Sequence, residues 1–276
     1  MAKEKISPQP RFEHFPRLEN LPDSSFPKHF AIIPDGNRRW AKAHKLEALR
    51  GHDNGRGKAL ELIRHLKELP IDVLSFWAFS SDNWKRDDKE VAGLMKIING
   101  GLRENMDELI ADQSRFIHIG RKDRIPQGLR KTLEELEDKS SSNAGKIVVM
   151  AIDFGGVDQT VRIVQNFMAD SVKEFAEEVD SDRSSTLKPA ADIFIAKKKQ
   201  EIDVVTIQRL YDGKGLIEPA DLLIRTSGEK RTSDIGWVNG ASTEIYFIDE
   251  NFPEINNPNI EDAILEFSKR QRRLGK

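Results

Sequence analysis

The chain has 276 residues, of which 38% are hydrophobic and 33% charged, and this composition suits one large α/β domain, or two small ones, with a real core. The net charge is −2, so no global basic field attracts nucleic acid; we expect no nucleic-acid partner, and any anion site must be local. The absence of cysteine excludes disulfides, thiolate catalysis and zinc sites built on sulfur. No His-x-x-x-His pair occurs, so the ligands of a working metal would be carboxylates, which favours magnesium.

The first 28 residues differ from the rest of the chain. They contain five prolines and many charges without a sustained hydrophobic period, so we expect an N-terminal arm over 1–28, either extended along the domain or disordered, and one domain over 29–276. No apolar run has the length of a signal peptide, and none reaches the roughly 20 residues that span a bilayer. The sequence therefore predicts a soluble, cytoplasmic protein that is at most peripheral to a membrane.

From residue 29 onward, short apolar runs alternate with longer amphipathic segments. The expected strands cover residues 30–33, 73–79, 116–119, 146–154, 221–224 and 244–247. One helix is expected to begin near residue 38, and four others are expected to cover 54–69, 89–110, 127–139 and 260–273. This alternation predicts an α/β fold with a mostly parallel central sheet flanked by helices. The charged stretch 179–203 is expected to be an exposed insertion of unknown role.

Polar and glycine residues follow four of the expected strands. They occupy residues 35–39, 80–86, 153–156 and 225–231. Because ligands of parallel sheets bind beyond the carboxyl ends of the strands, these four clusters are expected to face one crevice.

The cluster after the first strand has the composition of an anion site. Gly36 and the amides after it open a helix, where unpaired N–H groups point outward. Arg38, Arg39, Arg50 and His52 add charge-assisted donors suited to a diphosphate. Taken alone, the segment is equally consistent with a simple turn flanked by solvated arginines.

The loop at residues 225–233 offers a second set of donors, Arg225, Ser227, Arg231 and Ser233. Taken alone, this segment would be interpreted as a solvated charged loop. Two cationic loops on one sheet edge, with a carboxylate between them, instead favour an active site that binds two phosphate groups.

The carboxylate between the loops is Asp35, which has two interpretations. It is either a structural salt-bridge partner or a ligand of the magnesium that neutralises a leaving diphosphate. The second interpretation needs another acid, for which Glu244 is the best candidate.

In the helix of 89–110, Gly100 and Gly101 either break the helix or make room beside it for an apolar ligand.

Several long motifs resemble the signatures of the cis-prenyltransferases, the family that includes undecaprenyl and dehydrodolichyl diphosphate synthases. They are residues 29–42, residues 79–86, and residues 221–231 followed by 244–247. The similarity extends over residues 28–275 in one colinear order. It implies a homodimeric α/β domain that uses Mg²⁺ to condense isopentenyl diphosphate with an allylic diphosphate, of farnesyl or geranylgeranyl type, into a product with a Z double bond.

The resemblance also assigns roles residue by residue. Asp35 would bind magnesium with Glu244 and assist departure of the allylic diphosphate, and Asn83 matches the position proposed as proton acceptor. Because an amide is a poor base, we expect Asn83 to position a phosphate oxygen or water instead. The allylic diphosphate would bind Gly36, Asn37, Arg38, Arg39, Arg50 and His52, with Trp40 lining the site. The mobile substrate loop would carry Ser80, Ser81, Asp82, Asn83, Trp84 and Arg86. Isopentenyl diphosphate would bind Arg225, Arg231, Thr232 and Ser233, and Arg273 would reach a partner subunit.

The chain departs from the family pattern at several positions near these residues. Ala48 stands where members often carry arginine, and Arg50 is expected to substitute for it. The other departures are Asp82 for glutamate, Lys230 for histidine, Ser227 for glycine, and Asp153-Phe154 for asparagine-tyrosine. They retain the charges that diphosphates need and leave product length undetermined.

Three other functions fit parts of the sequence. A non-catalytic partner subunit of a heteromeric synthase would typically lack the loop aspartate and its arginines, which this chain has. Branched or cyclised coupling of short prenyl diphosphates would use the same diphosphate sites. A nucleotide or RNA phosphate binder is disfavoured by the near-neutral charge. Peripheral membrane contact for product release is compatible with each catalytic interpretation.

Overall fold

A computed structural model describes residues 10–181, 187–201, 217–236, 240 and 242–270. The elements, in chain order, are β1 (His29–Ile33), α1 (Asn37–Ala43), α2 (Ala48–Leu66), β2 (Val73–Ser80), the 3-10 helix η3 (Ser81–Lys85), α3 (Asp88–Ala111), β3 (Arg115–Ile119), α4 (Gln127–Lys139), β4 (Ile147–Phe154), α5 (Gly156–Ser181), α6 (Leu187–Glu201), β5 (Leu222–Arg225), β6 (Glu244–Phe247) and α8 (Asn257–Lys269). Short 3-10 turns η1 (Pro16–Leu18), η2 (Asp23–Ser25) and η5 (Phe252–Glu254) complete the set.

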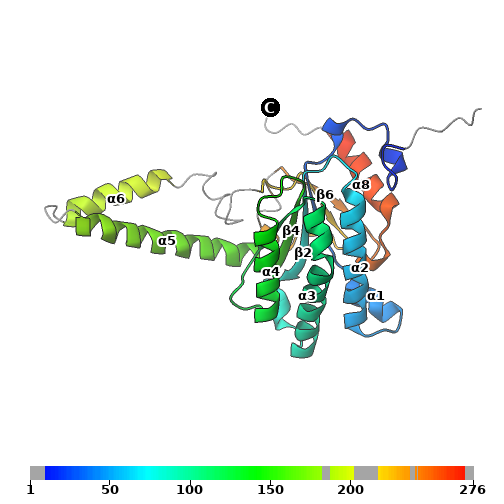
Figure 1. Cartoon of the computed structure of the whole chain (residues 1–276), viewed down its shortest axis with the longest axis horizontal. Helices are drawn as coiled ribbons and strands as arrows, with labels where there is room; N and C mark the ends of the chain where they lie inside the picture. Colours follow the sequence, from blue (N-terminus) through cyan, green and yellow to red (C-terminus); the bar gives the residue numbers. More distant parts are fainter. Residues whose placement is uncertain (1–9, 182–186, 202–216, 237–239, 241, 271–276) are drawn as a thin grey trace, which may run out of the picture.

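The six strands form one sheet in the order β3-β4-β2-β1-β5-β6, and every neighbouring pair is parallel. The α/β fold with a central parallel sheet flanked by helices is therefore confirmed (Figure 1). All carboxyl ends lie at one edge, where the segments after β1, β2, β4 and β5 meet. β1 is at the centre, so the residues that follow it can reach both halves of the sheet.

Alternate residues of the strands supply two apolar clusters, one on each face of the sheet. Phe30 and Ile32 of β1 join the larger cluster, which also contains apolar residues of α2, α3, α4 and α8. Ala31 and Ile33 join the smaller cluster on the other face. This period of two, with apolar residues on both faces, is what a buried parallel strand requires.

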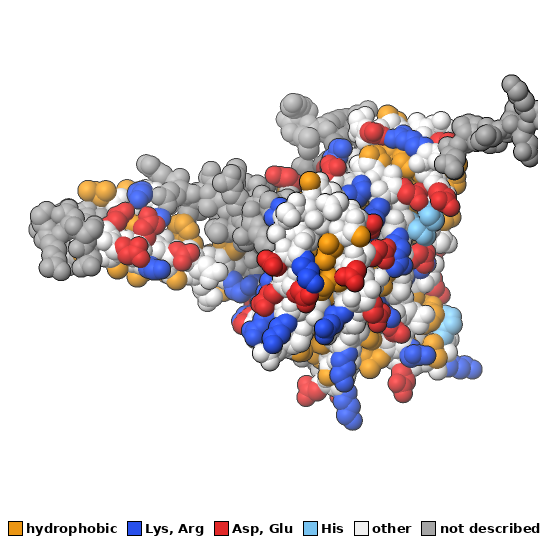
Figure 2. All heavy atoms as spheres, in the orientation of Figure 1, with side chains coloured by type: hydrophobic (Ala, Val, Ile, Leu, Met, Phe, Trp, Pro, Cys, Tyr) orange, Lys and Arg blue, Asp and Glu red, His pale blue; other side chains and the backbone are white. Residues whose placement is uncertain are grey.

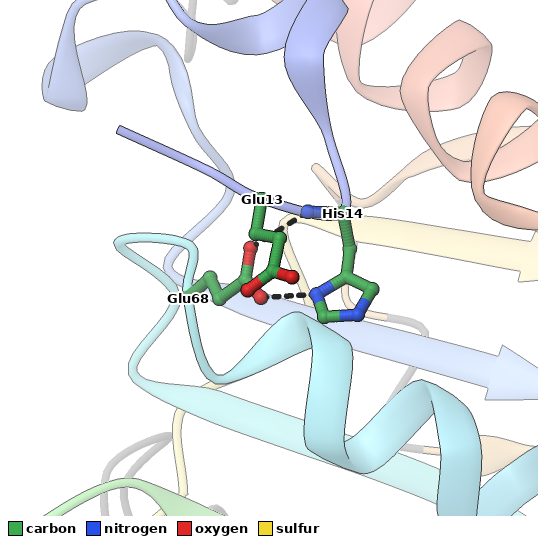
Figure 3. Close-up of side chains that lie close together, drawn as sticks. All are labelled: Glu13, His14 and Glu68. Carbon is green, nitrogen blue, oxygen red and sulfur yellow. Dashed lines mark hydrogen bonds and ion pairs between the residues drawn. The ribbon is translucent and has the colours of Figure 1, made fainter. Parts of the chain in front are cut away.

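The N-terminal segment from residue 10 to 28 packs into the larger cluster. Phe12, Phe15, Leu18 and Phe26 are all buried there. Beside them, His14 contacts Glu68 just beyond the end of α2 through both its ring and its backbone N–H, and Glu13 lies close by (Figure 3). The described part of the arm is thus an ordered component of the core.

Two of the helices, α5 and α6, pack against each other and project away from the body of the molecule (Figure 1). The sequence interpretation did not predict α5, and it placed an exposed insertion at 179–203, whose described part largely belongs to α6. Apolar residues of this hairpin remain exposed. Across the described helices, none combines the length and the apolar character needed to cross a bilayer.

Helix α2 begins at Ala48, six residues before the predicted start at Asn54. Gly51, Gly55 and Gly57 lower the helix propensity of this stretch, which is why the pattern alone placed the start too late. Gly51 and Gly55 are buried where α1 crosses α2, so close packing between the helices outweighs the propensity.

Two buried histidines predict acid sensitivity of the fold. Burial lowers the pKa of His29 and of His118 to about 4 from the ordinary value of 6.5. Between pH 6.5 and about 4, the unfolded chain therefore binds protons at these histidines while the native state does not. The free energy of unfolding consequently decreases as the pH is lowered through this range. Between pH 6.5 and 5 we expect a loss of about 2 kcal/mol per histidine.

Chemical denaturation at pH 7, 6 and 5 measures this effect, and His118→Gln should reduce its slope. A free energy of unfolding that stays constant from pH 7 to 5 would contradict the prediction.

Candidate active site

Asp35 lies just beyond β1, where its carboxylate joins the two cationic loops. It accepts hydrogen bonds from the Gly36 N–H at 2.7 Å, from Arg225 Nη2 at 2.8 Å and from Arg39 Nη2 at 3.2 Å. Burial alone would raise the pKa of Asp35, but the bonds from Arg225 and Gly36 outweigh it and the pKa is lowered. The carboxylate is therefore ionised at neutral pH and holds both loops.

The turn from β1 into α1 requires glycine at position 36. Gly36 has φ 97°, in the left-handed region, and a Cβ there would overlap the side chains of Ser227 and Asn251. The Phe252 N–H donates to the Asp35 carbonyl at 2.9 Å. The loop after β1 is thus fixed by the chain following β5 and β6.

Helix α1 is held close to α2 by the glycines of α2. A Cβ on Gly51 would overlap the backbone carbonyl of Asn37, and one on Gly55 would overlap the Asn37 amide oxygen. The Asn37 Nδ2 donates to the Pro34 carbonyl at 3.0 Å. The two glycines consequently set the position of the segment that carries Asn37, Arg38 and Arg39.

A half-buried acid, Glu90 of α3, links the arginines of two strand ends. Its Oε1 lies 3.2 Å from Arg86 and 3.6 Å from Arg38. His52 Nε2 is 3.8 Å away, beyond hydrogen-bond distance. Burial, followed by the charges of Arg86 and Arg38, lowers the pKa of His52 to about 4. His52 is therefore neutral at pH 7 in a cluster whose single acid faces two arginines.

The segment after β2 forms η3, which is stabilised by a reciprocal cap. The Asn83 amide oxygen accepts from the Ser80 N–H at 3.1 Å, while the Ser80 side chain accepts from the Asn83 N–H. The carbonyl oxygen of the Asn83 side chain is thus engaged by the backbone. Its NH₂ group remains the part that can orient a ligand, which supports a positioning role over that of a base.

The second cationic loop is organised around Arg225, the last residue of β5. Arg225 is buried, and its Nη1 donates to the Arg231 carbonyl at 2.6 Å and to Ser233 Oγ at 2.8 Å. Thr226 Oγ1 donates to the Asp35 carbonyl at 2.7 Å. Arg225 therefore fixes its own loop and Asp35 together.

Three hollows meet at this sheet edge. Two are lined by charged and polar residues, and both include Asp35, Asn37, His52 and Arg86. The third is predominantly apolar and shares only Pro34, Asn37 and His52 with both. It extends between α2, α3 and the sheet, and its lining includes Ala59, Ile63, Phe76, Leu94 and Gly101. A charged entrance thus leads into an apolar interior. Gly101 lines the apolar hollow, and helix α3 continues through it without a break.

Unpaired polar atoms mark the same region. In the part of the chain that the structure describes, five buried side-chain nitrogen or oxygen atoms lack a hydrogen-bond partner. Four of them belong to predicted site residues: Asn37 Oδ1, His52 Nε2, Trp84 Nε1 and Arg225 Nε. Because such atoms are costly to leave unpaired, their concentration here indicates a place that a ligand or water completes.

Some predicted site residues lie elsewhere. Glu244 is level with Phe30 through the register of β5, about 16 Å along the strands from Asp35, and it pairs with Arg270 at 2.7 Å. The expected metal pair of Asp35 and Glu244 therefore does not form within one chain. Arg50 is exposed, Trp40 stacks on His44, and Arg231 pairs with Glu229; none of the three lines the hollows. Arg273 lies outside the described residues.

Three site residues were not predicted from the sequence. Glu90 belongs to the first turn of a helix, Asn251 accepts a hydrogen bond from Ser227 Oγ at 2.9 Å, and Asp234 lines the hollow beside Ser233. Nothing in their local sequence distinguishes them from surface acids and amides. Only the position of Asp234 in the 225–236 loop offered a signal.

Comparisons with known proteins agree with this geometry. Residues 33–275 match the prenyltransferase family described as "Putative undecaprenyl diphosphate synthase". An isoprenyl transferase of Bacillus cereus is 32% identical, over 96% of this chain and 98% of that protein. A tritrans,polycis-undecaprenyl-diphosphate synthase (geranylgeranyl-diphosphate specific) of Pyrococcus horikoshii is 33% identical, over 99% and 96%.

A solved structure is similar over nearly the same length. Lavandulyl diphosphate synthase from Lavandula x intermedia, in complex with dimethylallyl diphosphate, superposes with a TM-score of 0.74 at 29% identity, covering 92% of this chain and all of that one. The chain belongs to the cis-prenyltransferase family. The predicted enzyme class, a transferase that condenses isopentenyl diphosphate with a prenyl diphosphate, is thereby confirmed.

The glycines of α2 provide a matched test of the site's packing. Gly51→Ala must push α1 away from α2, so we expect a loss of roughly 1–3 kcal/mol in stability together with a sharp fall in activity. Gly57→Ala, on the same helix with no atom near the added methyl, should be neutral or stabilising by up to about 1 kcal/mol. Thermal melts and turnover are compared for both variants. Equal behaviour of the two would refute the packing role.

Proposed function

We propose that the protein transfers an allylic prenyl group to isopentenyl diphosphate, creating a Z double bond and releasing diphosphate. The observation that carries this proposal is Asp35, which joins two cationic loops at the mouth of an apolar cavity. Two anion sites side by side fit two diphosphates, and the cavity fits an apolar chain attached to one of them.

The neighbouring apolar cavity supports an assignment of the two substrates to the two loops. Asn37 and His52 line the apolar cavity and both polar hollows, one of which lies over Arg38 and Arg39. An allylic diphosphate held there can direct its hydrocarbon chain inward. Isopentenyl diphosphate, which has only five carbons, would bind between Arg225, Ser233 and η3. Its alkene then lies beside the allylic carbon.

Magnesium is the metal that this site fits. Among the described residues, the one group of three carboxylate or histidine side chains with ligand atoms close together is Glu13, His14 and Glu68, on the N-terminal segment and just beyond the end of α2 (Figure 3). Asp35 belongs to no such group of three among the described residues. Magnesium commonly binds one or two carboxylates together with substrate phosphates and water, so Asp35 and a diphosphate would hold it. When bound, the metal would neutralise charge on the leaving diphosphate.

The chain's own residues would perform the remaining work. Arg38, Arg39 and Arg225 hold the diphosphates and stabilise the charge that develops as the allylic bond breaks. Asn83 orients the group that takes the proton from the methylene of isopentenyl diphosphate. The apolar wall excludes water, which would otherwise capture the allylic cation.

Chain elongation is favoured over branched coupling because the apolar cavity extends well past the charged entrance, between α2, α3 and the sheet. The test is incubation of purified protein with magnesium, labelled isopentenyl diphosphate and geranyl, farnesyl or geranylgeranyl diphosphate, followed by product sizing. Products spaced by five carbons support elongation. One product of fixed length with a branched skeleton would favour the alternative, and no product with any primer would overturn the proposal.

Asp35 is the residue whose replacement should cost most. Asp35→Asn keeps the shape but removes the charge that faces Arg225, Arg39 and the metal, so turnover should fall roughly a hundredfold or more. Asp88→Asn, in the first turn of α3, serves as the control and should retain activity. Turnover is measured beside a circular-dichroism melt. Normal turnover of Asp35→Asn would contradict the mechanism.

We further propose that two copies pair through the α5–α6 hairpin. Val157, Val161, Val164, Met168 and Val172 are exposed at helical spacing along α5, and Ile193 and Ile195 are exposed on α6 (Figure 2). Such a stripe resembles a coiled-coil seam and is too apolar to be an ordinary solvated face. A second copy of the same hairpin is the simplest complementary surface.

Charge placed on this stripe should separate the subunits. Val164→Glu combined with Met168→Glu is expected to convert a dimer into a monomer in analytical ultracentrifugation, while Lys173→Glu, on an exposed polar position of the same helix, should not. A wild-type protein that sediments as a monomer at micromolar concentration, or a double variant that remains dimeric, would exclude this interface.

A further inference from the structure

An ion pair lies at the end of β4, next to the proposed active site. Asp153 is fully buried, and Arg124, in the connection between β3 and α4, donates to it twice, from Nε at 2.9 Å and from Nη2 at 2.5 Å. Such bidentate geometry holds the guanidinium in one plane. Asp153 itself has φ 52°, a left-handed conformation that its short polar side chain tolerates. The strand end is therefore built to place this carboxylate under Arg124.

Neither residue lines the polar hollows, so the pair has no evident contact with substrate. Asp153 is fully buried, whereas the Arg124 side chain is 38% exposed, so only the carboxylate has lost its water. Such an ion pair adds little net stability. What distinguishes the pair is the position that it gives the guanidinium.

The guanidinium of Arg124 also faces Trp84 of η3, with its central carbon 5.9 Å from the ring centroid. On another side, Trp84 meets Phe79 edge to face at 5.3 Å. Trp84 directly follows Asn83, so the ring anchors the part of η3 that faces the substrates. Arg124 consequently connects η3 to the rigid end of β4.

A second contact holds the other end of η3 to the same strand end. A Cβ on Gly155 would overlap Ser81 Oγ, so Ser81 packs directly on the backbone after β4. The neighbouring Gly156 N–H donates to the Asp234 carbonyl at 2.9 Å, which brings the 225–236 loop to the same place. The 3-10 helix η3 and the 225–236 loop thus both contact the segment of residues 153–156.

We propose that Arg124, held in plane by Asp153, is a positioning residue that clamps Trp84 and thereby fixes Asn83 and the isopentenyl diphosphate side of the site. This inference rests on the proposed function for its catalytic consequence, whereas the ordering of η3 can be measured without substrate. The competing explanation is that the pair contributes only to the stability of the fold.

Three variants and a control separate these explanations. Arg124→Gln removes the clamp and leaves Asp153 buried without a cation. The double variant Arg124→Gln/Asp153→Asn also removes the clamp but relieves the unpaired charge, and Asp153→Asn alone keeps the guanidinium. Arg121→Gln is the matched control, because Arg121 lies on the same connection and pairs with Asp123 and Asp158 instead. Each protein is measured for melting temperature, hydrogen exchange of residues 80–86 without substrate, and KM for isopentenyl and allylic diphosphates.

A clamp predicts that the double variant recovers melting temperature relative to Arg124→Gln but not loop order. Exchange of residues 80–86 should rise roughly threefold to thirtyfold in both proteins lacking Arg124, the size of a cation–π contact, and KM should rise for isopentenyl diphosphate more than for the allylic substrate. Arg121→Gln should leave the exchange of residues 80–86 and the KM for isopentenyl diphosphate unchanged. Exchange that recovers in step with melting temperature, or that never changes, would overturn the clamp. Because exchange is read without substrate, an enzyme inactive in the product assay would refute the proposed function and still leave this test decisive.

Discussion

The contact between Asp35 and Arg225 is the interaction on which the rest of the site depends. Parallel strands bring the ends of β1 and β5 together, and the 2.8 Å ion pair then holds the loops that follow them in one arrangement. Arg39 joins the same carboxylate from α1. Without this acid, several arginines would repel one another at the sheet edge. With it, the edge is preorganised for anions yet keeps its arginines available.

The other charges follow the same logic. Glu90 performs for Arg38 and Arg86 what Asp35 performs for Arg39 and Arg225, and His52 stays neutral beside them. A diphosphate carries more negative charge than either acid and can replace their contacts in both clusters. The glycines of α2 supply no charge, and the strand end at residues 153–156 has its one charge paired with Arg124, but both set where these clusters lie. Packing thus determines where the two clusters of charged side chains lie.

Much of the fold was predictable because its signals are local. The six strands, helix α4 and the loop with Asp35 and Gly36 follow from hydrophobic period and turn chemistry. The start of α2 was misplaced because Gly51 and Gly55 serve a contact with α1 that no local propensity reveals. Helix α5 was missed, and its apolar stripe has no partner among the residues that the structure describes. That Glu244 does not reach Asp35 within one chain could not be predicted, because its register, level with Phe30, depends on how β6 pairs with β5. Glu90 could not be selected among similar helix acids, since its partners come from three other segments.

The proposed function requires that two diphosphates bind side by side, one on each cationic loop, with Asp35 and a metal between them. The most direct measurement is a crystal structure of the protein with magnesium, isopentenyl diphosphate and an unreactive thiolo analogue of farnesyl diphosphate. We expect one diphosphate over Arg38 and Arg39 with its chain in the cavity beside Gly101. The other should lie at Arg225 and Ser233, and the metal on Asp35. Diphosphates bound away from either loop, or a farnesyl chain outside that cavity, would contradict it.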